Sequence, residues 1–443
     1  MSEGRRILVV GAGAREHALC WRLSREPGVE RVFVAPGNPL MRDVAEVHSN
    51  LPVDDHGALA ALARAVAADL VVVGPEAPLV GGLADRFAEA RIPCFGPSAA
   101  AAMLEGSKSF CRDVCRAAGV PMADGRSFDD VAAALAFARR MEAPLVVKAD
   151  GLAAGKGVAV CASLDEVERH VRAALEAGRF GESGGRVVIE RYLDGREGSV
   201  IALCDGRDGL VLPAARDHKR LSDTDTGPNT GGMGAYSPVE ELDRPTLEQV
   251  YESFHRPVLD EMARRGTPFQ GALYAGLMLT ADGPYLLEFN VRLGDPETQA
   301  ILPRLATGLS LASLLAAAAA GDMARAARDA GIDEFVLPAD PGAAVGITLA
   351  AAGYPDAPRT GNPVGGITEA RAAGALVFGA ALSDGPDGSL VTGGGRVLTI
   401  VGRGADLESA ADAAYGAAGE ISFAGRQMRH DIGRRAVPIG ANA

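Results

Sequence analysis

Residues 286–299 read Leu-Leu-Glu-Phe-Asn-Val-Arg-Leu-Gly-Asp-Pro-Glu-Thr-Gln, an apolar strand that runs into a turn rich in charged side chains. Successive side chains of a strand point to opposite faces, so Glu288, Asn290 and Arg292 are expected on one face. A carboxylate and an amide oxygen are ligands of the kind that Mg²⁺ prefers, and an arginine suits a phosphate or carboxylate. Taken alone, this pattern favours a half-buried strand with a solvated polar face over a metal–phosphate centre. The rest of the chain changes that balance.

The composition limits the class of protein. The chain has 443 residues, more than one ordinary core holds, which predicts about two to four domains. Its formal net charge of −13 argues against a nucleic-acid-binding protein, because phosphate binding needs a basic surface. The longest apolar run, Leu311–Ala320, is too short to span a bilayer, and the first residues enter a strand without an apolar leader. We therefore expect no nucleic-acid partner and no membrane partner.

The cysteines indicate a reducing compartment. They are scattered along the chain, and the spacing of Cys111 and Cys115 is neither a CxxC redox motif nor half of a zinc site. Free thiols in a chain of this length are typical of the cytoplasm. We therefore expect a cytoplasmic protein.

Secondary-structure signals divide the chain into three domains. Residues 1–104 alternate short apolar runs with amphipathic helices, which predicts an α/β domain with a Rossmann-like parallel sheet buried on both faces. Residues 105–330 predict an α+β domain, with a smaller unit at about 124–193 that carries a mobile glycine-rich loop. Short strands with turn signals predict a small β-rich C-terminal domain over residues 331–443. The polar stretch Asp217–Gly234 is predicted as a long loop, and such loops are often functional.

Residues 11–16, Gly-Ala-Gly-Ala-Arg-Glu, follow the first predicted strand and open the first helix. Gly13 lets the backbone approach a phosphate at the helix N-terminus, and Arg15 is available to pair with it. A dinucleotide fingerprint needs a third glycine where Glu16 stands, so the pattern excludes NAD. The alternative is a tight turn without a ligand. Glu76, just past the third predicted strand, is placed to hold ribose hydroxyls, although this signal is weak alone.

Residues 151–157, Gly-Leu-Ala-Ala-Gly-Lys-Gly, lie between two predicted strands. They are not a P-loop, because the spacer is one residue short and Lys156 is followed by Gly157 rather than Ser or Thr. A flexible glycine loop can still close over phosphates with its backbone N–H groups. Lys148 on the preceding strand adds a cation, although a lone lysine more often lies at the surface. A plain hairpin turn is the alternative.

Other polar residues carry weaker signals. Glu190 and Glu197 flank a connection suited to an adenine edge and ribose hydroxyls, but each alone is more often a solvated carboxylate. Asp217 and Lys219 stand in the long polar loop, which suits closure around a small polar substrate. His218 has no His or Cys partner at ligand spacing and is not expected to bind a metal. The sequence shows neither a nucleophile elbow nor an HExxH helix, which argues against hydrolase chemistry.

In this order, the motifs resemble those of the ATP-grasp ligases and, within them, the glycinamide ribonucleotide synthetases, or phosphoribosylamine–glycine ligases. The most specific segments are residues 227–238, Gly-Pro-Asn-Thr-Gly-Gly-Met-Gly-Ala-Tyr-Ser-Pro, and residues 292–299. The Glu-x-Asn pattern alone indicates only the ATP-grasp superfamily. The matching segments run from one end of the chain to the other: residues 11–19, 74–79, 94–98, 148–158, 217–238, 287–299 and 429–433.

The resemblance implies an N-terminal pre-ATP-grasp domain, a central ATP-grasp domain whose lid subdomain is mobile, and a specific reaction. Enzymes of this family join glycine to 5-phosphoribosylamine and convert ATP to ADP and phosphate in de novo purine synthesis. The glycine carboxylate is first phosphorylated to glycyl phosphate, which the amine then attacks. Mg²⁺ or Mn²⁺ offsets the phosphate charge, and closing loops exclude water from the acyl phosphate. A monomer is expected, with ATP, glycine and 5-phosphoribosylamine as its small-molecule partners.

The resemblance also implies roles for individual residues. The metal would be held by Glu288 and Asn290. The ATP phosphates would meet Lys108, Lys148 and the loop that contains Gly151, Gly155, Lys156 and Gly157, and the adenosine would meet Glu190, Leu193 and Glu197. Glycine and the acyl phosphate would meet Asp217, Lys219, Arg292 and Asp295, which are the catalytic candidates. Phosphoribosylamine would face Gly13, Arg15, Glu16 and Glu76.

The sequence departs from the family pattern at three places. Ala14 replaces a glycine, Leu293 replaces a phenylalanine, and Val377–Ala381 differs from a Phe-His-Ala-Gly-Thr-like stretch, which puts a substrate contact there in doubt. None of these departures removes an expected metal or phosphate ligand. Two rival functions stay open: another carboxylate–amine ligase of the same fold, and a nucleotide-binding regulatory protein without turnover.

Overall fold

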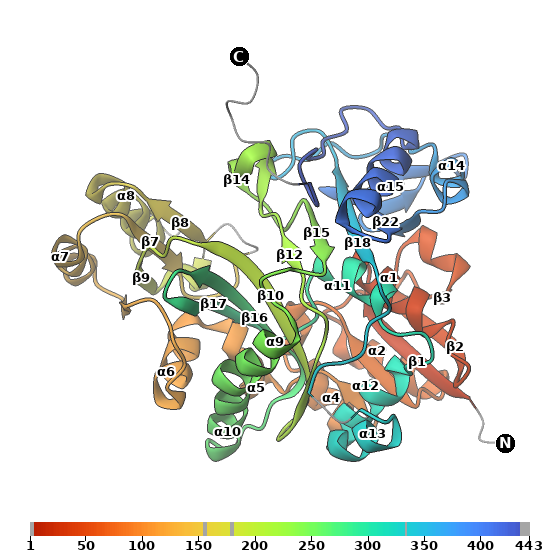
Figure 1. Cartoon of the computed structure of the whole chain (residues 1–443), viewed down its shortest axis with the longest axis horizontal. Helices are drawn as coiled ribbons and strands as arrows, with labels where there is room; N and C mark the ends of the chain where they lie inside the picture. Colours follow the sequence, from red (N-terminus) through yellow and green to blue (C-terminus); the bar gives the residue numbers. More distant parts are fainter. Residues whose placement is uncertain (1–3, 154–156, 178–180, 333–334, 435–443) are drawn as a thin grey trace.

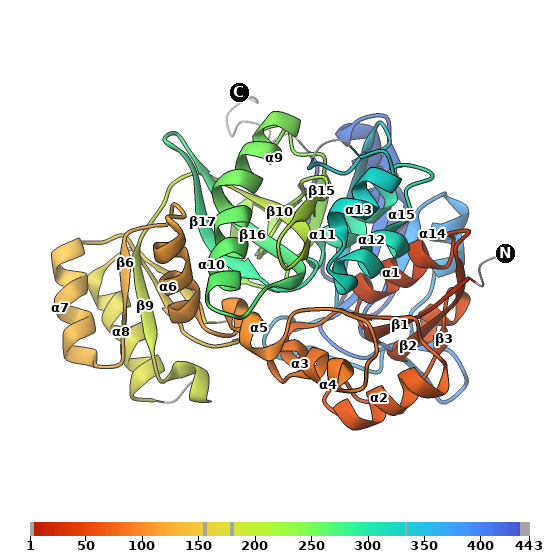
Figure 2. The ribbon, with the colours of Figure 1, turned by 90° about the horizontal axis from the view of Figure 1, so that it is seen from below.

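The computed structural model describes residues 4–153, 157–177, 181–332 and 335–434. The lid forms one end of the molecule, and the N-terminal and C-terminal units lie together at the other end (Figure 1). The central unit stands between these two ends, as the view in Figure 2 also shows. We use these names for the following parts of the chain: the N-terminal unit (residues 5–106), the lid (125–191), the central unit (mainly 196–329) and the C-terminal unit (343–434).

The N-terminal unit contains the parallel sheet that the apolar runs predict. Its strands pair in parallel in the order β3-β2-β1-β4-β5. Alternate side chains of β1 enter two different cores, Leu8 and Val10 on one face and Ile7 and Val9 on the other. The strands are β1 Arg5–Gly11, β2 Val29–Pro36, β3 Glu46–Val47, β4 Leu70–Val73 and β5 Cys94–Phe95. The helices are α1 Ala14–Leu23, α2 His56–Ala65, α3 Glu76–Val80, α4 Leu83–Glu89 and α5 Ala99–Gly106.

The lid is an antiparallel sheet in the order β6-β9-β7-β8, with α7 and α8 packed against each other. Its hydrophobic cluster draws on lid residues alone, from Ala134 to Ile189. The lid therefore has a core of its own. Its elements are β6 Gly125–Phe128, α7 Val131–Met141, β7 Leu145–Ala149, β8 Val158–Cys161, α8 Leu164–Leu175 and β9 Val187–Arg191. Helix α6, Lys108–Ala118, leads into it.

The central unit is an antiparallel sheet in the order β11-β10-β16-β17. Leu286 and Phe289 of β17 belong to the same hydrophobic cluster as Leu8 and Val10 of β1, so this sheet and the N-terminal sheet share a core. Its strands are β10 Arg196–Asp205, β11 Gly209–Val211, β16 Gln270–Thr280 and β17 Gly283–Asn290. Its helices are α9 Arg244–Val250, α10 Arg256–Arg264, α11 Glu297–Ile301, α12 Leu311–Ala320 and α13 Met323–Asp329, with a π-helical turn at Tyr251–His255.

The C-terminal unit is β-rich, as predicted, but its sheet includes strands from the predicted loop. The order is β12-β15-β18-β22-β19, and β15 pairs antiparallel with β18. The stretch Asp217–Gly234 is therefore not a structureless loop. It contains the hairpin β13–β14 and leads from β12 into β15. The elements are β12 Arg216–Asp217, β13 Arg220–Ser222, β14 Thr226–Asn229, β15 Gly234–Ser237, β18 Ala343–Ala350, α14 Ile367–Ala372, β19 Leu376–Gly379, β20 Leu382–Asp384, β21 Leu390–Thr392, β22 Arg396–Gly404 and α15 Leu407–Glu420.

Two helical stretches of the chain are each divided into two helices. Helices α5 and α6 are separate, because Ser107 ends α5 and its hydroxyl caps α6 by accepting from the Phe110 N–H. Helices α12 and α13 are separate, because Gly321, whose φ is 75°, ends α12. Short 3₁₀ turns lie at Pro39–Asp43, Gly181–Gly184, Asp223–Asp225 and Leu302–Arg304.

Two expectations from the sequence concern membrane-spanning helices and the state of the cysteine thiols. Within the described part of the chain, no helix is both long and apolar enough to cross a bilayer. All six cysteines lie within the described residues, and each is a free thiol.

A buried arginine joins the hairpin β13–β14 to the C-terminal segment. The Arg429 side chain is 1% exposed and donates to Asp225 at 2.6 Å, to Asp431 at 2.7 Å and to the carbonyl oxygen of Arg220 at 3.2 Å. Asp431 in turn accepts from the Thr224 N–H at 2.9 Å. Thr224 and Asp225 both have positive φ, a conformation that non-glycine residues rarely adopt. These contacts hold the hairpin in that conformation.

We predict that Arg429→Met loosens this hairpin. Its two carboxylate partners lose their cation, and since Asp225 is mostly exposed and Asp431 is partly exposed, the cost is expected to be about 1–3 kcal/mol. Hydrogen exchange should become faster in residues 220–229, and the thermal midpoint should fall. Arg434→Met, which removes an exposed ion pair to Asp412, is the control. Unchanged exchange in the hairpin of the Arg429 variant would contradict the assignment.

Candidate active site

The end of β17 brings together the three side chains that strand alternation predicts on one face. The Asn290 amide nitrogen lies 3.5 Å from a Glu288 carboxylate oxygen, and Arg292 donates to the Asn290 amide oxygen at 3.2 Å. The pairing of β16 with β17 slips at Leu287, whose carbonyl oxygen accepts from Lys148 at 2.9 Å. The irregularity thus ties the lid to the strand that carries Glu288.

Three lysines surround Glu288. Burial opposes its ionisation, but the charges of Lys219, Lys148 and Lys108 outweigh burial and hold the Glu288 pKa below its usual range. Lys108 also donates to the carbonyl oxygen of Gly151 at 3.2 Å. An ionised carboxylate among cations is suited to a polyphosphate and its metal ion, because both signs of charge are present.

Glu190 lies beside Lys148 rather than in open solvent. One of its oxygens is 2.6 Å from Lys148, and the other accepts from Arg112 at 2.7 Å. Arg112 also donates to the carbonyl oxygens of Ala123 and Gly125, so it links α6 to the first residues of the lid. Both carboxylate oxygens of Glu190 therefore have cationic partners within the protein.

The other expected nucleotide contacts lie along the edges of the lid. Gly151 donates its N–H to the Ser183 carbonyl oxygen at 3.2 Å, and Gly157 accepts from the Ala149 N–H at 2.7 Å. Leu193 is half-buried in the connection between β9 and β10. Gly155 and Lys156 lie outside the described residues.

A second group of carboxylates adjoins the first. Lys219 is 2.5 Å from Glu197 and 4.0 Å from Asp217, so Glu197 is joined to the glycine-site candidates rather than standing apart. Burial raises the pKa of Asp217 to about 7 against the opposing charge of Lys219. Burial opposes the charge of Lys219, but Asp217 and Glu197 outweigh it and raise the Lys219 pKa. Glu297 lies close by, accepting from Tyr274 at 2.8 Å.

Arg292 connects the central unit to the N-terminal unit. It lies 3.3 Å from Glu76 at the start of α3 and 3.3 Å from Glu105 in α5. Glu105 also accepts from the Val291 N–H at 2.7 Å. Burial raises the pKa of Glu105 to about 7, with Arg292 opposing this shift. The end of β17 is thus held by carboxylates of the neighbouring unit.

The charged side chains in the first turn of α1 pair with each other. Glu16 is buried; it accepts from the Gly13 N–H at 2.6 Å and from Arg15 at 2.5 Å. Any side chain at Gly11 or Gly74 would overlap the Glu16 carboxyl group. The glycines around this turn therefore make room for a carboxylate. A phosphate that approaches here meets donors already paired with Glu16.

Asp295 is held by residues on both sides. Its two carboxylate oxygens accept from Arg396 and from Gln299, each at 2.7 Å. Burial opposes ionisation, but Arg396 and Arg15 outweigh it and keep the Asp295 pKa below its usual range. Asp295 is therefore a charged and oriented group at the meeting point of three units.

Sequence reasoning missed five charged or polar residues of this centre. Arg112 had a signal, because it follows Lys108 by four residues and so shares its helix face. Glu297 stands inside the segment 286–299 and was given no role. The others, whose partners lie far away in the chain, had no local signal: Glu105, Tyr274 and Arg396.

The donor set fits a metal that is shared with a ligand. Among the described residues, no group of three or more His, Cys, Asp or Glu side chains is arranged to hold a metal ion. Mg²⁺ is usually held by one or two protein oxygens together with substrate phosphates and water, which Glu288 and Asn290 match. Turning the Asn290 amide over would present its oxygen beside the Glu288 carboxylate.

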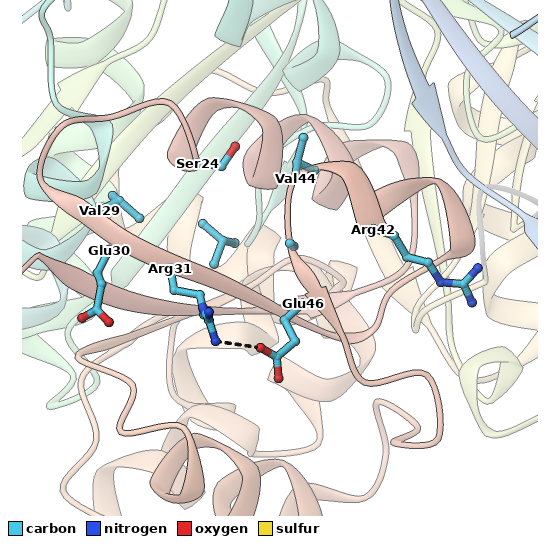
Figure 3. A pocket seen from close by; sticks show the side chains of 9 residues that line it. Ser24, Val29, Glu30, Arg31, Arg42, Val44 and Glu46 are labelled. Atoms are coloured by element: carbon cyan, nitrogen blue, oxygen red, sulfur yellow. Dashed lines mark hydrogen bonds and ion pairs between the residues drawn. The ribbon is translucent and has the colours of Figure 1, made fainter. Parts of the chain in front are cut away.

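A surface recess of about 330 Å³ lies elsewhere, on the N-terminal unit (Figure 3). It is lined by residues of β2 and its neighbours, including an ion pair of 3.2 Å between Arg31 and Glu46. None of the expected site residues lines it. The candidate site is therefore the charged centre around β17.

Comparison with known proteins gives the same assignment over the whole chain. Family models of phosphoribosylglycinamide synthetase match in sequence order: the N domain at residues 5–105, the ATP-grasp (A) domain at 106–298 and the C domain at 344–435. A phosphoribosylamine–glycine ligase of Caulobacter vibrioides is 46% identical over 431 residues, covering 97% of this chain and 98% of that protein. One of Streptomyces coelicolor is 46% identical over 435 residues, covering 97% and 99%.

Solved structures agree. The phosphoribosylamine–glycine ligase of Thermotoga maritima superposes with a TM-score of 0.82 at 33% identity, covering 96% of this chain and 99% of that one. The biotin carboxylase domain of Hydrogenobacter thermophilus 2-oxoglutarate carboxylase has a TM-score of 0.69 at 18% identity, covering 97% and 92%, a likeness of fold alone. The chain belongs to the phosphoribosylamine–glycine ligase family of ATP-grasp enzymes.

Proposed function

We propose that this chain joins glycine to 5-phosphoribosylamine, with ATP converted to ADP and phosphate through glycyl phosphate, and that the residues at the end of β17 carry the reaction. The observation that supports these roles is the position of Glu288 among cations: Lys148 donates to the carbonyl oxygen of the preceding residue, Leu287, at 2.9 Å. The charges of Lys219, Lys148 and Lys108 hold the Glu288 pKa below its usual range. Beside it lie the glycine-site candidates, and Arg292 leads to the N-terminal unit. One continuous charged centre thus joins the places proposed for the three substrates.

The chemistry explains the mixture of charges. A carboxylate is a poor electrophile, so glycine must first receive a leaving group from ATP. Phosphoryl transfer is aided mainly by positioning and by cations that offset the charge on the transferred group. Lys148 and Lys108 are proposed to hold the ATP phosphates. Their present acceptors, Glu190 and the carbonyl oxygens of Leu287 and Gly151, would give way to phosphate oxygens when ATP binds.

Glu288 and Asn290 are the proposed metal ligands. A Mg²⁺ ion held by these two side chains would offset part of the negative charge on the ATP phosphates. Oxygen ligands of this kind also accept Mn²⁺, so either ion is proposed to support the reaction. Arg292 donates to the Asn290 amide oxygen at 3.2 Å and would release that oxygen when it turns toward the metal.

Water has to be kept away from glycyl phosphate, which it would hydrolyse. We propose that the lid, including the loop from Gly151 to Gly157, closes over the nucleotide with its own core intact. Glu190, Leu193 and Glu197 then border the adenosine, along the connection between the lid and the central unit.

Glycine is proposed to bind between Lys219 and Arg292, whose charges suit its carboxylate, with Asp217 near its amino group. Asp295 remains charged and orients the reacting groups. Phosphoribosylamine approaches from the N-terminal unit, where Gly13, Arg15, Glu16 and Glu76 form the turn at the carboxyl edge of the parallel sheet. Open α/β sheets bind ligands at this edge.

All proposed groups come from one chain, and we propose that the enzyme acts as a cytoplasmic monomer. The six free thiols support a reducing compartment. ADP release measured with each substrate omitted in turn tests the substrate assignment. Release that needs both glycine and freshly made 5-phosphoribosylamine supports it, whereas equal release with another amino acid would point to a different ligase of the same fold. A complete lack of product would favour a nucleotide-binding regulatory protein.

We predict that Glu288→Gln lowers turnover by about 100-fold or more while the protein stays folded. The amide keeps the size of the side chain but removes the negative charge that holds the metal ion and faces the lysines. Turnover is measured as ADP release at saturating substrates, together with the circular dichroism spectrum. Glu240→Gln, at an exposed position, is the control. Near-normal turnover of the Glu288 variant would refute the metal role.

We predict that Asp217 makes the stability of the substrate-free protein fall as the pH rises from about 4 to 7. Its native pKa of about 7 lies above its ordinary value, so the native state keeps a proton that the unfolded state has already lost. Unfolding then releases a proton, so a rising pH lowers the free energy of unfolding, by at most about 1.4 kcal/mol per pH unit. Asp217→Asn removes this dependence.

The measurement is the unfolding midpoint of both proteins between pH 5 and 7. The variant should gain stability relative to the original protein as the pH rises, and Asp282→Asn, at an exposed turn, should show no such trend. A constant difference between the Asp217 variant and the original protein over this range would show that the carboxyl group has an ordinary pKa.

A further inference from the structure

Arg396, at the start of β22, extends from the C-terminal unit to the active site. Its guanidinium donates to the Asp295 carboxylate at 2.7 Å and to the Asp295 carbonyl oxygen at 3.0 Å. It also donates to the carbonyl oxygen of Gly231 at 2.5 Å. A planar guanidinium can hold several acceptors in a defined geometry. Arg396 therefore joins two loops that lie 64 residues apart in the chain, at positions 231 and 295.

Tyr354 completes this clamp from the same unit. Its hydroxyl oxygen accepts from the Gly231 N–H at 2.9 Å, so Gly231 is held by Tyr354 through its N–H and by Arg396 through its carbonyl. The backbone packs closely around this contact. A side chain at Gly395 would overlap the Tyr354 ring, and one at Gly232 would overlap Pro296. We call Arg396 and Tyr354 the C-terminal clamp.

The clamp acts on residues that the proposed function places at the substrates. Thr230, next to Gly231, donates through its N–H at 2.7 Å and its hydroxyl at 2.8 Å to the Lys219 carbonyl oxygen. A shift of Gly231 would therefore move Lys219. Asp295 is held by the clamp on one oxygen and by the fully buried Gln299 on the other.

We propose that Arg396 and Tyr354 are positioning residues that set the distance between Lys219 and Asp295, and so hold the glycine subsite in its reactive geometry. This inference rests on the proposed function, because it assigns a purpose to the spacing of those two groups. Neither clamp residue has to touch a substrate. The nucleotide-side lysines Lys108 and Lys148 have no contact with the clamp in the described structure.

The test compares Arg396→Met, Arg396→Lys and Tyr354→Phe with Arg403→Met, an exposed arginine on the same strand. Arg396→Met should lower kcat/KM for glycine about 100-fold, the scale expected for a misplacement of about 1 Å, while KM for ATP stays within about twofold. Arg396→Lys should recover part of the loss, because it restores one charged contact to Asp295. Tyr354→Phe should cost about tenfold or less.

A double-variant comparison separates positioning from general damage. In an Asp295→Asn background, adding Arg396→Met should cause little further loss, because both changes break the same contact. Parallel increases in KM for ATP and glycine together with a lower thermal midpoint would overturn the proposal, since they indicate a merely structural role. An Arg396→Met enzyme with unchanged kcat/KM for glycine would overturn it as well.

Hydrogen exchange tests the clamp independently of the substrate assignment. Arg396→Met should speed exchange in residues 230–234 and 293–297 and leave the lid unchanged. If the original protein showed no glycine-dependent ADP release but this exchange pattern appeared, the proposed function would fail while the clamp stood. Unchanged exchange in both segments would show that Arg396 does not hold the two loops.

Discussion

The arrangement of the whole centre depends on keeping the half-buried carboxylate of Glu288 charged. An unpaired charge removed from water costs several kcal/mol, and a protein can offset this only with nearby opposite charges. Lys108, Lys148 and Lys219 supply them from α6, from β7 and from the segment after β12. Because these elements belong to different parts of the fold, the charge balance at β17 is satisfied only when the units are assembled around it.

The same assembly explains which parts of the structure were predictable. The parallel sheet was visible because its strands are continuous apolar runs, and the grouping of Glu288, Asn290 and Arg292 followed from the alternation of a strand. Strands β12 and β15 could not be predicted from the sequence. They are short, and β15 finds its partner in β18, more than 100 residues later, so no local pattern marks it. A polar, glycine-rich stretch was therefore mistaken for a loop without regular structure.

Charged residues of the site also have partners that no local sequence pattern marks. Glu105 and Arg396 look like ordinary surface charges in the sequence, and only the folded chain brings each to the end of β17 or the turn behind it. Arg112 is different, because its distance of four residues from Lys108 already places the two on one helix face. Even there, its role beside Glu190 depended on a strand 78 residues away. Local periodicity predicts which face a residue occupies, and long-range pairing decides what that face meets.

The turn before α1 has a consequence for ligand choice. Sheets of this topology often receive a dinucleotide at the first turn, where a pyrophosphate fills the space above the glycines. Here the carboxylate of Glu16 fills that space and takes the Gly13 N–H for itself. The chain thus carries its own anion at this turn, and any ligand that binds here meets a Gly13 N–H that is already paired.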